Sequence, residues 1–266
     1  MVINIGIIGL GTVGSGVIET IEKNQSFFFK EYKIKLKIAG ITAKNKNKKR
    51  SFDLKKYKWF KCPLDLAQSA EIDVVVELIG GADGIALDIA KIALTKKKNL
   101  VTANKAMIAI HGYQLKRLAN KYSVNLNFEA SVAGGIPIIR TLENSLLADK
   151  ITKVYGILNG TCNYILTQMN EKKLSFDQAL KSAQRLGYAE ANPFDDVSGT
   201  DTAYKLLILS NLAFGLNVNL KDIYLEGITR IESIDIEMAN KLGYSILLLG
   251  ISKIKKNVVE YRVHPS

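Results

Sequence analysis

The N-terminal segment of the chain contains the pattern that most restricts its fold. Val2 to Ile8 is an apolar run rich in β-branched residues, which predicts a buried strand. The sequence GLGTVG follows at once and has the spacing G-x-G-x-x-G, and VGSGVIETIEKN after it predicts a helix. A strand, a glycine turn and a helix in this order are typical of dinucleotide binding, with a plain glycine-rich turn as the alternative.

Each of the three glycines in this turn has a physical reason for its position. Gly9 permits a tight turn, Gly11 lets the backbone approach a pyrophosphate, and Gly14 lets the helix pack closely on the strand. Thr12 and Val13 open the helix, whose free N–H groups and dipole favour phosphate groups. We therefore expect these five residues to contact a nucleotide cofactor.

Strands and helices then alternate along the first half of the chain. Strands are predicted at 34–42, 73–80, 99–106 and 124–130, and helices at 83–98 and 106–122. This alternation predicts an α/β unit at 1–130, a Rossmann-type doubly wound parallel sheet. Ligands bind such sheets beyond the carboxyl ends of the strands, so Gly80, Thr102, Ala103 and Lys105 are predicted to lie near the cofactor. For Lys105, an exposed lysine at a helix start is the alternative.

The end of the second predicted strand indicates which dinucleotide binds. A site for NAD usually has Asp or Glu there, to bind the ribose 2′-OH, whereas this chain has ITAKNKNKKR without an acid. Lys44 and its basic neighbours would attract a 2′-phosphate, so we expect NADP to be preferred over NAD. A solvated lysine-rich loop is the alternative.

Composition excludes several function classes. The net charge of +12 suggests nucleic-acid binding, but only six of the 37 basic residues are Arg, which base recognition favours, so we expect no nucleic-acid partner. No apolar run approaches the roughly 20 residues of a membrane span, and no membrane partner is expected. Cys62 and Cys162 form no disulfide framework, which favours a cytoplasmic protein. His111 and His264 are expected to be structural.

The pattern changes after about residue 130. Strands are predicted at 151–158, 223–230, 244–253 and 257–264, with helices between them and one at 136–147. Residues 131–266 therefore predict an α+β domain with a mostly antiparallel or mixed sheet. The turn Asn159-Gly160-Thr161 leads from a strand into a helix, and its backbone donors would hold a substrate carboxylate.

The stretch GYAEANPFDDVSGTDTAYK combines four acids with one lysine. Asp201 and Lys205 are four residues apart at the start of a predicted apolar helix, so they share one face. A solvated ion pair is the alternative to a partly buried lysine that donates a proton. Lys205 and Lys105 would serve a carbonyl oxygen, and Glu190 and Asp196 would hold a substrate ammonium. An amino acid bearing an aldehyde or alcohol fits these demands.

These residues resemble the homoserine dehydrogenase family. The spacing A-x-x-x-G-Y-A-x-x-N-P-x-x-D-V-x-G-x-D-x-x-x-K, from Ala183 to Lys205, matches the family signature without a gap. GLGTVG, VTANKA, EASVAGGIP and GILNGTCNYIL are similar to the family's other landmarks, in the same order, over essentially the whole chain. The resemblance implies NAD(P)-dependent interconversion of L-aspartate 4-semialdehyde and L-homoserine, a step toward threonine, methionine and isoleucine.

The resemblance also implies roles for individual residues. Lys205 matches the catalytic proton donor, Lys105 matches the lysine near nicotinamide and substrate, and Tyr188 lines the substrate pocket. Three acids match those of the homoserine pocket: Glu190, Asp196 and Asp201.

The segment EASVAGGIP resembles a site for a monovalent cation, Na⁺ or K⁺, with an ordinary loop as the alternative. Its ligands would be Glu129, Val132, Gly134 and Ile136. The family is also typically homodimeric through the sheet of the second domain.

One feature departs from the family pattern. The chain stops at EYRVHPS, whereas family members usually continue with further strands and a segment that returns to the nucleotide domain. The second domain is therefore expected to be truncated. Two alternatives to an active homoserine dehydrogenase follow: a related dehydrogenase for another small amino-acid-like substrate, and an inactive nucleotide-binding fragment. The acid cluster beside Lys205 argues against the first.

Overall fold

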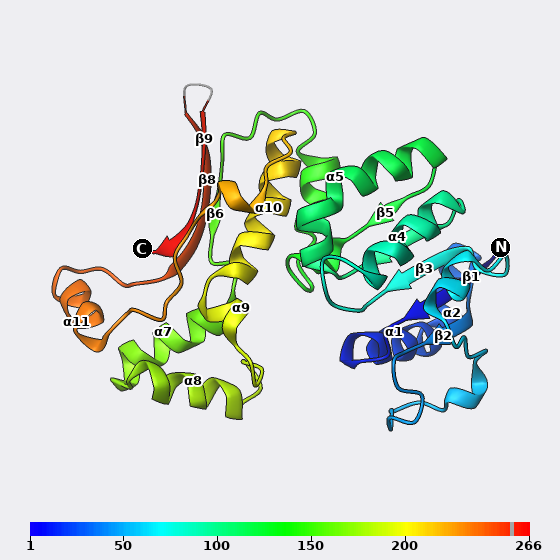
Figure 1. The fold of residues 1–266 in the computed structure, drawn as a ribbon, viewed down its shortest axis with the longest axis horizontal. Coiled ribbons are helices and arrows are strands. Elements are labelled where there is room, and N and C mark those ends of the chain that lie inside the picture. The colour runs from blue at the N-terminus through cyan, green and yellow to red at the C-terminus, as the bar shows by residue number, and fades with distance from the viewer. Residues whose placement is uncertain (256–257) are drawn as a thin grey trace. The chain divides into compact units, whose positions relative to one another are not determined.

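The computed structural model describes residues 1–255 and 258–266, which form two units, Met1–Gly135 and Ile136–Ser266 (Figure 1). Unit 1 is built on a parallel sheet in the order β2-β1-β3-β4-β5. Its strands are β1 (Val2–Ile8), β2 (Lys35–Thr42), β3 (Val74–Glu77), β4 (Asn99–Thr102) and β5 (Leu126–Asn127). The chain changes its direction of winding between β2 and β3, so the crevice for ligands lies beyond the ends of β1 and β3. The predicted Rossmann-type sheet is confirmed.

Helices connect the strands of unit 1. They are α1 (Thr12–Lys23), α2 (Gln25–Tyr32), α3 (Pro63–Gln68), α4 (Ile85–Thr95) and α5 (Lys105–Tyr122), with 3₁₀ turns η1 (Leu54–Lys56) and η2 (Glu129–Ser131). The predicted strand at 124–130 is wrong in its second half, because the hydroxyl and N–H of Ser131 both donate to the carbonyl of Phe128 and close η2.

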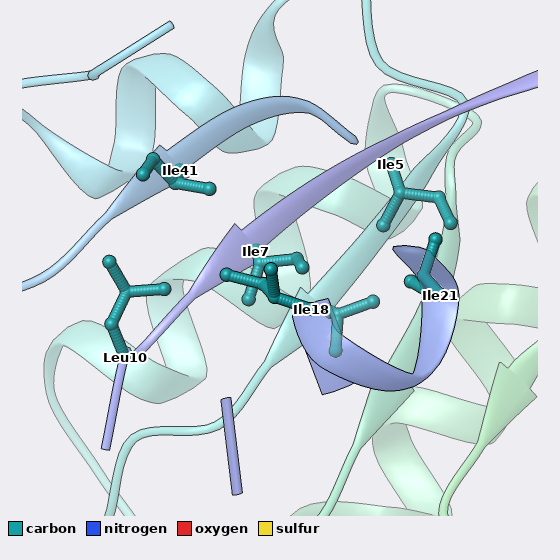
Figure 2. Close-up of a cluster of buried hydrophobic side chains, with 7 residues drawn as sticks. Ile5, Ile7, Leu10, Ile18, Ile21 and Ile41 are labelled. Carbon is teal, nitrogen blue, oxygen red and sulfur yellow. The ribbon is translucent and has the colours of Figure 1, made fainter. Parts of the chain in front are cut away.

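Isoleucine side chains of β1, α1 and β2 form a core of unit 1 (Figure 2). The cluster comprises Ile5, Ile7, Leu10, Ile18, Ile21, Ile41 and Val76. Ile7, Ile18 and Ile41 have no solvent exposure. Burial of one side chain of this size stabilises the fold by about 1.5–3 kcal/mol. The contacts hold α1 against β1, and therefore hold the glycine turn between them.

Unit 2 contains a mixed sheet in the order β6-β8-β9-β7. Its strands are β6 (Lys153–Gly156), β7 (Tyr224–Leu225), β8 (Leu248–Lys255) and β9 (Val258–Pro265). The pairs β6–β8 and β8–β9 are antiparallel, whereas β7 and β9 are parallel, which confirms the predicted mixed sheet. Residue 257, the predicted start of the last strand, lies outside the described residues.

Three strands of unit 2 are shorter than predicted, and β6 covers only the middle of the predicted strand at 151–158. The predicted strand at 223–230 stops at Leu225 because the chain turns toward α9 (Phe194–Val197), where the Ile228 N–H donates to the Val197 carbonyl (2.9 Å). A Cβ at Gly227 would lie 2.1 Å from that carbonyl oxygen, so only glycine permits the approach. Residues 244–247 precede β8 and are not part of it.

Helix α10 (Thr200–Phe214) packs on one face of this sheet, against β6, β8 and β9 (Figure 1). A buried hydrogen bond of 2.7 Å joins the Ser210 hydroxyl to Ser252 on β8. The other helices of unit 2 are α6 (Ile138–Arg140), α7 (Gly160–Lys172), α8 (Phe176–Arg185) and α11 (Ser233–Lys241), with a π-helical turn at Thr141–Ser145 and a 3₁₀ turn at Leu220–Asp222. In the described ranges, no helix has the length and apolarity needed to cross a membrane.

Candidate active site

Close contacts shape the glycine turn after β1. The Gly9 N–H donates to the Thr42 carbonyl (3.0 Å), and Gly9 has a φ of +99°, a conformation that favours glycine. A Cβ at Gly14 would lie 1.9 Å from the Gly9 carbonyl oxygen, so α1 approaches β1 this closely only because residue 14 is glycine. At Gly11, among the described residues other than its two chain neighbours, no heavy atom lies within 4 Å of the Cβ position. The backbone at Gly11 is therefore open to a ligand.

The start of α1 faces the same open region. Thr12 and Val13 are exposed, and Val13 retains 55% of its accessible surface. The N-cap residue, Gly11, has no side chain that could accept a hydrogen bond from the first turn. The first N–H groups of α1 can therefore bind an anion.

The other predicted cofactor residues lie at the ends of β3 and β4. Gly80 is exposed in the turn after β3, and Thr102 is buried at the end of β4. Ala103 and half-buried Lys105 follow, and Lys105 is the first residue of α5. The turn after β3 touches the glycine turn, because a Cβ at Gly9 would lie 2.6 Å from the Leu78 carbonyl oxygen. These segments form one edge of the sheet.

The basic loop after β2 is organised by Arg50. Lys44 is exposed, whereas the Arg50 guanidinium donates to carbonyls within its own loop, including that of Lys48 at 2.7 Å. Arg50 Nε also donates to the carbonyl of Leu10 in the glycine turn, at 3.4 Å. The loop is thereby tied to the turn that precedes α1, and sequence analysis had singled out Lys44 and not Arg50.

Unit 2 contains a cluster of four polar side chains, two of which are buried and two half-buried. The Asn159 amide nitrogen donates to Asp196 Oδ1 (2.7 Å) and to Asp201 Oδ2 (2.8 Å). Lys205 Nζ lies 2.8 Å from Asp201 Oδ2. Asn159 and Asp201 are only 4% and 2% exposed. Two carboxylates can lie close together here because the Asn159 amide donates to both and the Lys205 ammonium pairs with Asp201.

Lys205 is held at a second point. Its ammonium donates to the Leu158 carbonyl at the end of the β6–α7 connection (2.9 Å), and its side chain is 18% exposed. An ammonium has three N–H groups, and Asp201 and Leu158 account for two of them. Lys205 is thus a fixed, partly buried cation whose remaining exposed surface can reach a ligand.

Asn159 has a structural role that the sequence patterns did not predict. Its Oδ1 accepts from the Cys162 N–H (2.7 Å), which caps α7, while its amide nitrogen bridges the two aspartates. The backbone at exposed Gly160 and half-buried Thr161 starts the helix, as a carboxylate-binding turn requires. The only sequence signal for the bridge is an Asn at a helix N-cap.

Tyr188 and Glu190 lie in the loop between α8 and α9. The Thr161 hydroxyl donates to the Tyr188 carbonyl (2.6 Å), and the Tyr188 ring stacks on Tyr164 with centroids 4.8 Å apart. Tyr188 is 57% exposed. Glu190 is exposed, and its backbone carbonyl accepts from Gln184 (3.2 Å). The structure therefore fixes the backbone of this loop and leaves the Glu190 carboxylate facing solvent.

The buried thiol beside the cluster is chemically inert. Burial, with smaller contributions from Asp196 and Asp201, raises the pKa of Cys162 to about 12. Its Sγ lies 3.1 Å from the Asp196 carbonyl oxygen. Because the thiolate is the nucleophilic form, Cys162 is no nucleophile at neutral pH.

The predicted cation ligands lie in one continuous segment. Glu129 begins η2, and Val132, which follows it, is 7% exposed. Gly134 is the second-last residue of unit 1, and Ile136 begins unit 2. Over the described residues, no group of three or more His, Cys, Asp and Glu side chains could hold a metal ion. A cation here would depend on backbone carbonyls, as the resemblance implies.

Comparisons with known proteins assign both units to one family. Residues 9–129 match the family model of the homoserine dehydrogenase NAD-binding domain, and residues 137–266 match the model of homoserine dehydrogenase. The homoserine dehydrogenase of Helicobacter pylori is 46% identical over 99% of this chain and 61% of its own length. The chain thus spans about three fifths of this curated relative.

Solved structures agree with the sequence comparison. A homoserine dehydrogenase from Thiobacillus denitrificans is 40% identical with a TM-score of 0.92, covering 100% of this chain and 61% of that one. A protein of Archaeoglobus fulgidus that bears the same family name is 32% identical with a TM-score of 0.87, covering 99% and 83%. A hyperthermophilic archaeal homoserine dehydrogenase in complex with NADPH is 26% identical with a TM-score of 0.80, covering 100% and 82%.

Proposed function

Because the chain belongs to the homoserine dehydrogenase family, we propose that it interconverts L-aspartate 4-semialdehyde and L-homoserine with a nicotinamide dinucleotide. Unit 1 is the nucleotide-binding domain, and unit 2 binds the substrate and a second copy of the chain. The observation that carries the proposal is the buried Asp201–Lys205 pair, which Asn159 joins to Asp196.

Lys205 is the proton donor in this proposal. Reduction of an aldehyde places negative charge on the carbonyl oxygen, which needs a proton or a positive charge beside it. Asp201 and the Leu158 carbonyl hold the ammonium of Lys205 in one place. Asp201 also balances the charge of Lys205, so the ammonium is retained in a partly buried environment. Lys105, at the start of α5, supplies a second positive charge.

Unit 2 supplies groups for both ends of an amino acid. Asp196 and Glu190 hold the substrate ammonium, with Tyr188 lining the pocket. The N–H groups of Gly160 and Thr161 hold the carboxylate at the N-terminus of α7, which is 13 residues long. The side chain of Asn159 orients the acids, because both ends of its amide already make protein hydrogen bonds.

The glycine turn fits a dinucleotide. The open space at Gly11 admits a pyrophosphate, which the first N–H groups of α1 would bind. The nicotinamide ring supplies or accepts the hydride. Thr102, Ala103 and Gly80 belong to the edge that would face it. Lys44 lies in the loop that Arg50 joins to Leu10. Its ammonium would attract the 2′-phosphate, so we expect NADP to bind more tightly than NAD.

The open face of the unit 2 sheet supports a homodimer. Ser252 and Gly250 on β8 face α10, so Ile251 between them faces away from it. Tyr155 and Tyr224, which are in register with Ile251 through neighbouring strands, are 65% and 58% exposed. We place a second copy of the chain on this face.

Three further parts of the proposal follow from the family resemblance. Carbonyls of the segment EASVAGGIP bind Na⁺ or K⁺, the protein acts in the cytoplasm, and its product leads to threonine, methionine and isoleucine. Addition of KCl in place of an organic salt should raise activity if the cation site exists.

One assay tests the activity. Purified protein is mixed with L-homoserine and NADP⁺ or NAD⁺, and the absorbance of the reduced nicotinamide is followed. Turnover with homoserine, but not with the same amount of L-threonine or L-serine, supports the proposal. Protein that binds the nucleotide and does not turn homoserine over would disprove the proposed reaction. Restored growth of a bacterial strain that requires homoserine tests the role in biosynthesis.

A further inference from the structure

A completely buried acid lies at the ligand-binding edge of unit 1. Glu77 is the last residue of β3 and has no solvent exposure. It is aligned with Ile8 on β1 and Thr102 on β4, the two strands next to it. Desolvation of a carboxylate in such a place is costly, and burial raises the pKa of Glu77. A buried acid that opposes folding in this way calls for a functional explanation.

The hydrogen bonds of Glu77 match the ionised carboxylate. Oε1 accepts from the Ile79 N–H (2.7 Å), and Oε2 accepts from the Thr102 hydroxyl (2.6 Å). Thr102 Oγ1 also accepts from the Asn104 N–H (2.9 Å), while its own hydroxyl proton is donated to Glu77. Both oxygens of Glu77 thus accept hydrogen bonds, an arrangement that suits the ionised carboxylate better than a protonated acid or an amide.

The network continues into the turn after β3. The Asn104 amide nitrogen donates to the carbonyls of Ile79 (3.1 Å) and Gly81 (2.7 Å), and its Oδ1 accepts from Met107 to cap α5. His111 on α5 contacts Asp83 at 2.8 Å, further along the same turn. Side chains of α5 therefore hold the turn at two points, and Glu77 holds its first residue.

This network lies directly behind the edge that a nucleotide would occupy. Leu78, between Glu77 and Ile79, touches the glycine turn at Gly9. Lys105 follows Asn104 in the chain and begins the helix that Asn104 caps. A shift of the Glu77 network would therefore displace both the turn after β3 and the start of α5.

We infer that ionised Glu77 is a positioning residue, which fixes the turn Ile79–Gly81 and the start of α5 and thereby sets nucleotide affinity and the placement of Lys105. The inference rests on the proposed nucleotide site. Glu77 acts through Thr102 and Asn104, and it needs no contact with the substrate.

Isosteric variants test the inference. Glu77→Gln places an NH₂ group against either the Ile79 N–H or the Thr102 hydroxyl. In the first case the N–H loses its acceptor, and in the second the hydroxyl proton must turn away from residue 77. We expect the Kd for NAD⁺, measured by calorimetry, to rise roughly tenfold or more. Thr102→Val removes the donor to Glu77 and should produce a similar rise, whereas Thr102→Ser, which keeps the hydroxyl, should restore wild-type affinity. In the assay, Glu77→Gln should lower kcat as well, because Lys105 moves.

Lys98→Met is the matched control. Lys98 is also buried in unit 1, at 6% exposure, and its ammonium donates to the Ser69 carbonyl (2.6 Å) and to that of Ile72. It precedes β4, at the opposite edge of the sheet from Glu77. Its loss should lower stability without changing the Kd for NAD⁺ by more than about twofold.

The dependence of the Kd on pH separates positioning from a general effect on folding. The groups that face the carboxylate, from Thr102, Ile79 and Asn104, do not titrate. The titratable residues of the adjoining turn and of the first two turns of α5 are Asp83, Lys105 and His111. The affinity of the wild type for NAD⁺ should fall between neutral pH and about pH 5, while that of Glu77→Gln stays flat. NAD⁺ is the better probe because the 2′-phosphate of NADP⁺ itself has a pKa of about 6.

The outcomes are distinct. Wild-type protein that binds no nucleotide would overturn the proposed function. Wild-type protein that binds NAD⁺, together with folded Glu77→Gln or Thr102→Val protein that binds it equally well, would overturn the inference alone. If Glu77→Gln fails to fold, the comparison of Thr102→Val with Thr102→Ser decides the matter.

Discussion

The carboxylate of Asp201 lies 2.8 Å from the ammonium of Lys205, one turn further along α10, and only 2% of the Asp201 side chain is exposed. Asn159 donates to Asp201, and the Leu158 carbonyl accepts from Lys205; both residues belong to the β6–α7 connection. The pair on α11, Glu237 and Lys241, has the same spacing and a similar distance of 2.7 Å, but both side chains are more than half exposed. The two pairs differ in burial, and this difference underlies the first prediction.

Lys205→Ala should lower kcat about 10²- to 10⁴-fold, because the developing alkoxide loses its proton donor. The Kd for the nucleotide should stay within about twofold of wild type, since Lys205 belongs to unit 2. Lys241→Ala is the control, and we expect it to leave both quantities unchanged because an exposed pair contributes little. Steady-state kinetics and calorimetry check these values, and an equal loss of kcat and nucleotide affinity would indicate misfolding.

Asn159→Ala should destabilise the protein by about 2–4 kcal/mol, the sum of a lost helix cap and two buried carboxylate oxygens that lose a donor. Ser175→Ala removes the exposed capping box of α8 and should cost only about 1 kcal/mol. Urea denaturation of both variants gives the comparison. Equal losses would mean that the bridge between Asp196 and Asp201 adds nothing beyond the cap.

Three glycines at the start of α1, the N-cap Gly11 and the helical Gly14 and Gly16, should respond differently to alanine. Gly14→Ala should destabilise unit 1 by at least about 1–3 kcal/mol, because its Cβ would overlap the Gly9 carbonyl. Gly11→Ala should fold normally but bind the nucleotide more weakly, because the Cβ enters the space proposed for the pyrophosphate. Gly16→Ala, with no neighbour within 4 Å, should raise stability by up to about 1 kcal/mol. Thermal unfolding and nucleotide titration of the three variants test this order.

Lys44→Ala should weaken NADP⁺ binding roughly tenfold and leave NAD⁺ binding nearly unchanged, because only NADP⁺ carries the 2′-phosphate. Lys55→Ala, in the exposed 3₁₀ turn η1, is the control for a general loss of positive charge. Titrations with both dinucleotides at several salt concentrations provide the measurement. A parallel loss for NAD⁺ and NADP⁺ would remove Lys44 from the proposed site.

The stability of the wild type relative to Glu77→Gln should depend on pH in a defined direction. Burial raises the folded-state pKa of Glu77 above its unfolded value of about 4.3, so the folded protein binds the proton more tightly. The contribution of Glu77 to stability is therefore present below the unfolded pKa and is lost as pH rises through the folded pKa. The difference in unfolding free energy, wild type minus variant, should grow as pH falls from neutral toward about 5. A constant or shrinking difference in urea titrations would contradict the assignment.

Sequence patterns alone predict the elements whose cause is local. The apolar run of β1, the glycine spacing before α1 and the alternation of strands and helices depend on neighbours within a few residues, and the structure confirms them. The short strands were predicted less well. β7 ends at Leu225 because Gly227 lets the chain approach Val197, a contact between residues 30 positions apart that no local pattern reports.

For the candidate site too, the sequence determined the local relationships and the tertiary structure determined the long-range ones. The spacing of Asp201 and Lys205 by itself determined that they share a helix face, because the period of an α-helix brings residues i and i+4 together. Only the tertiary structure decided that this face is buried, that Asn159 bridges Asp196 and Asp201 from 37 and 42 residues away, and that Glu77 bonds Thr102 across 25 residues. The physical reason is that burial and long-range hydrogen bonds depend on how strands and helices pack, and packing is not encoded in any single stretch of the chain.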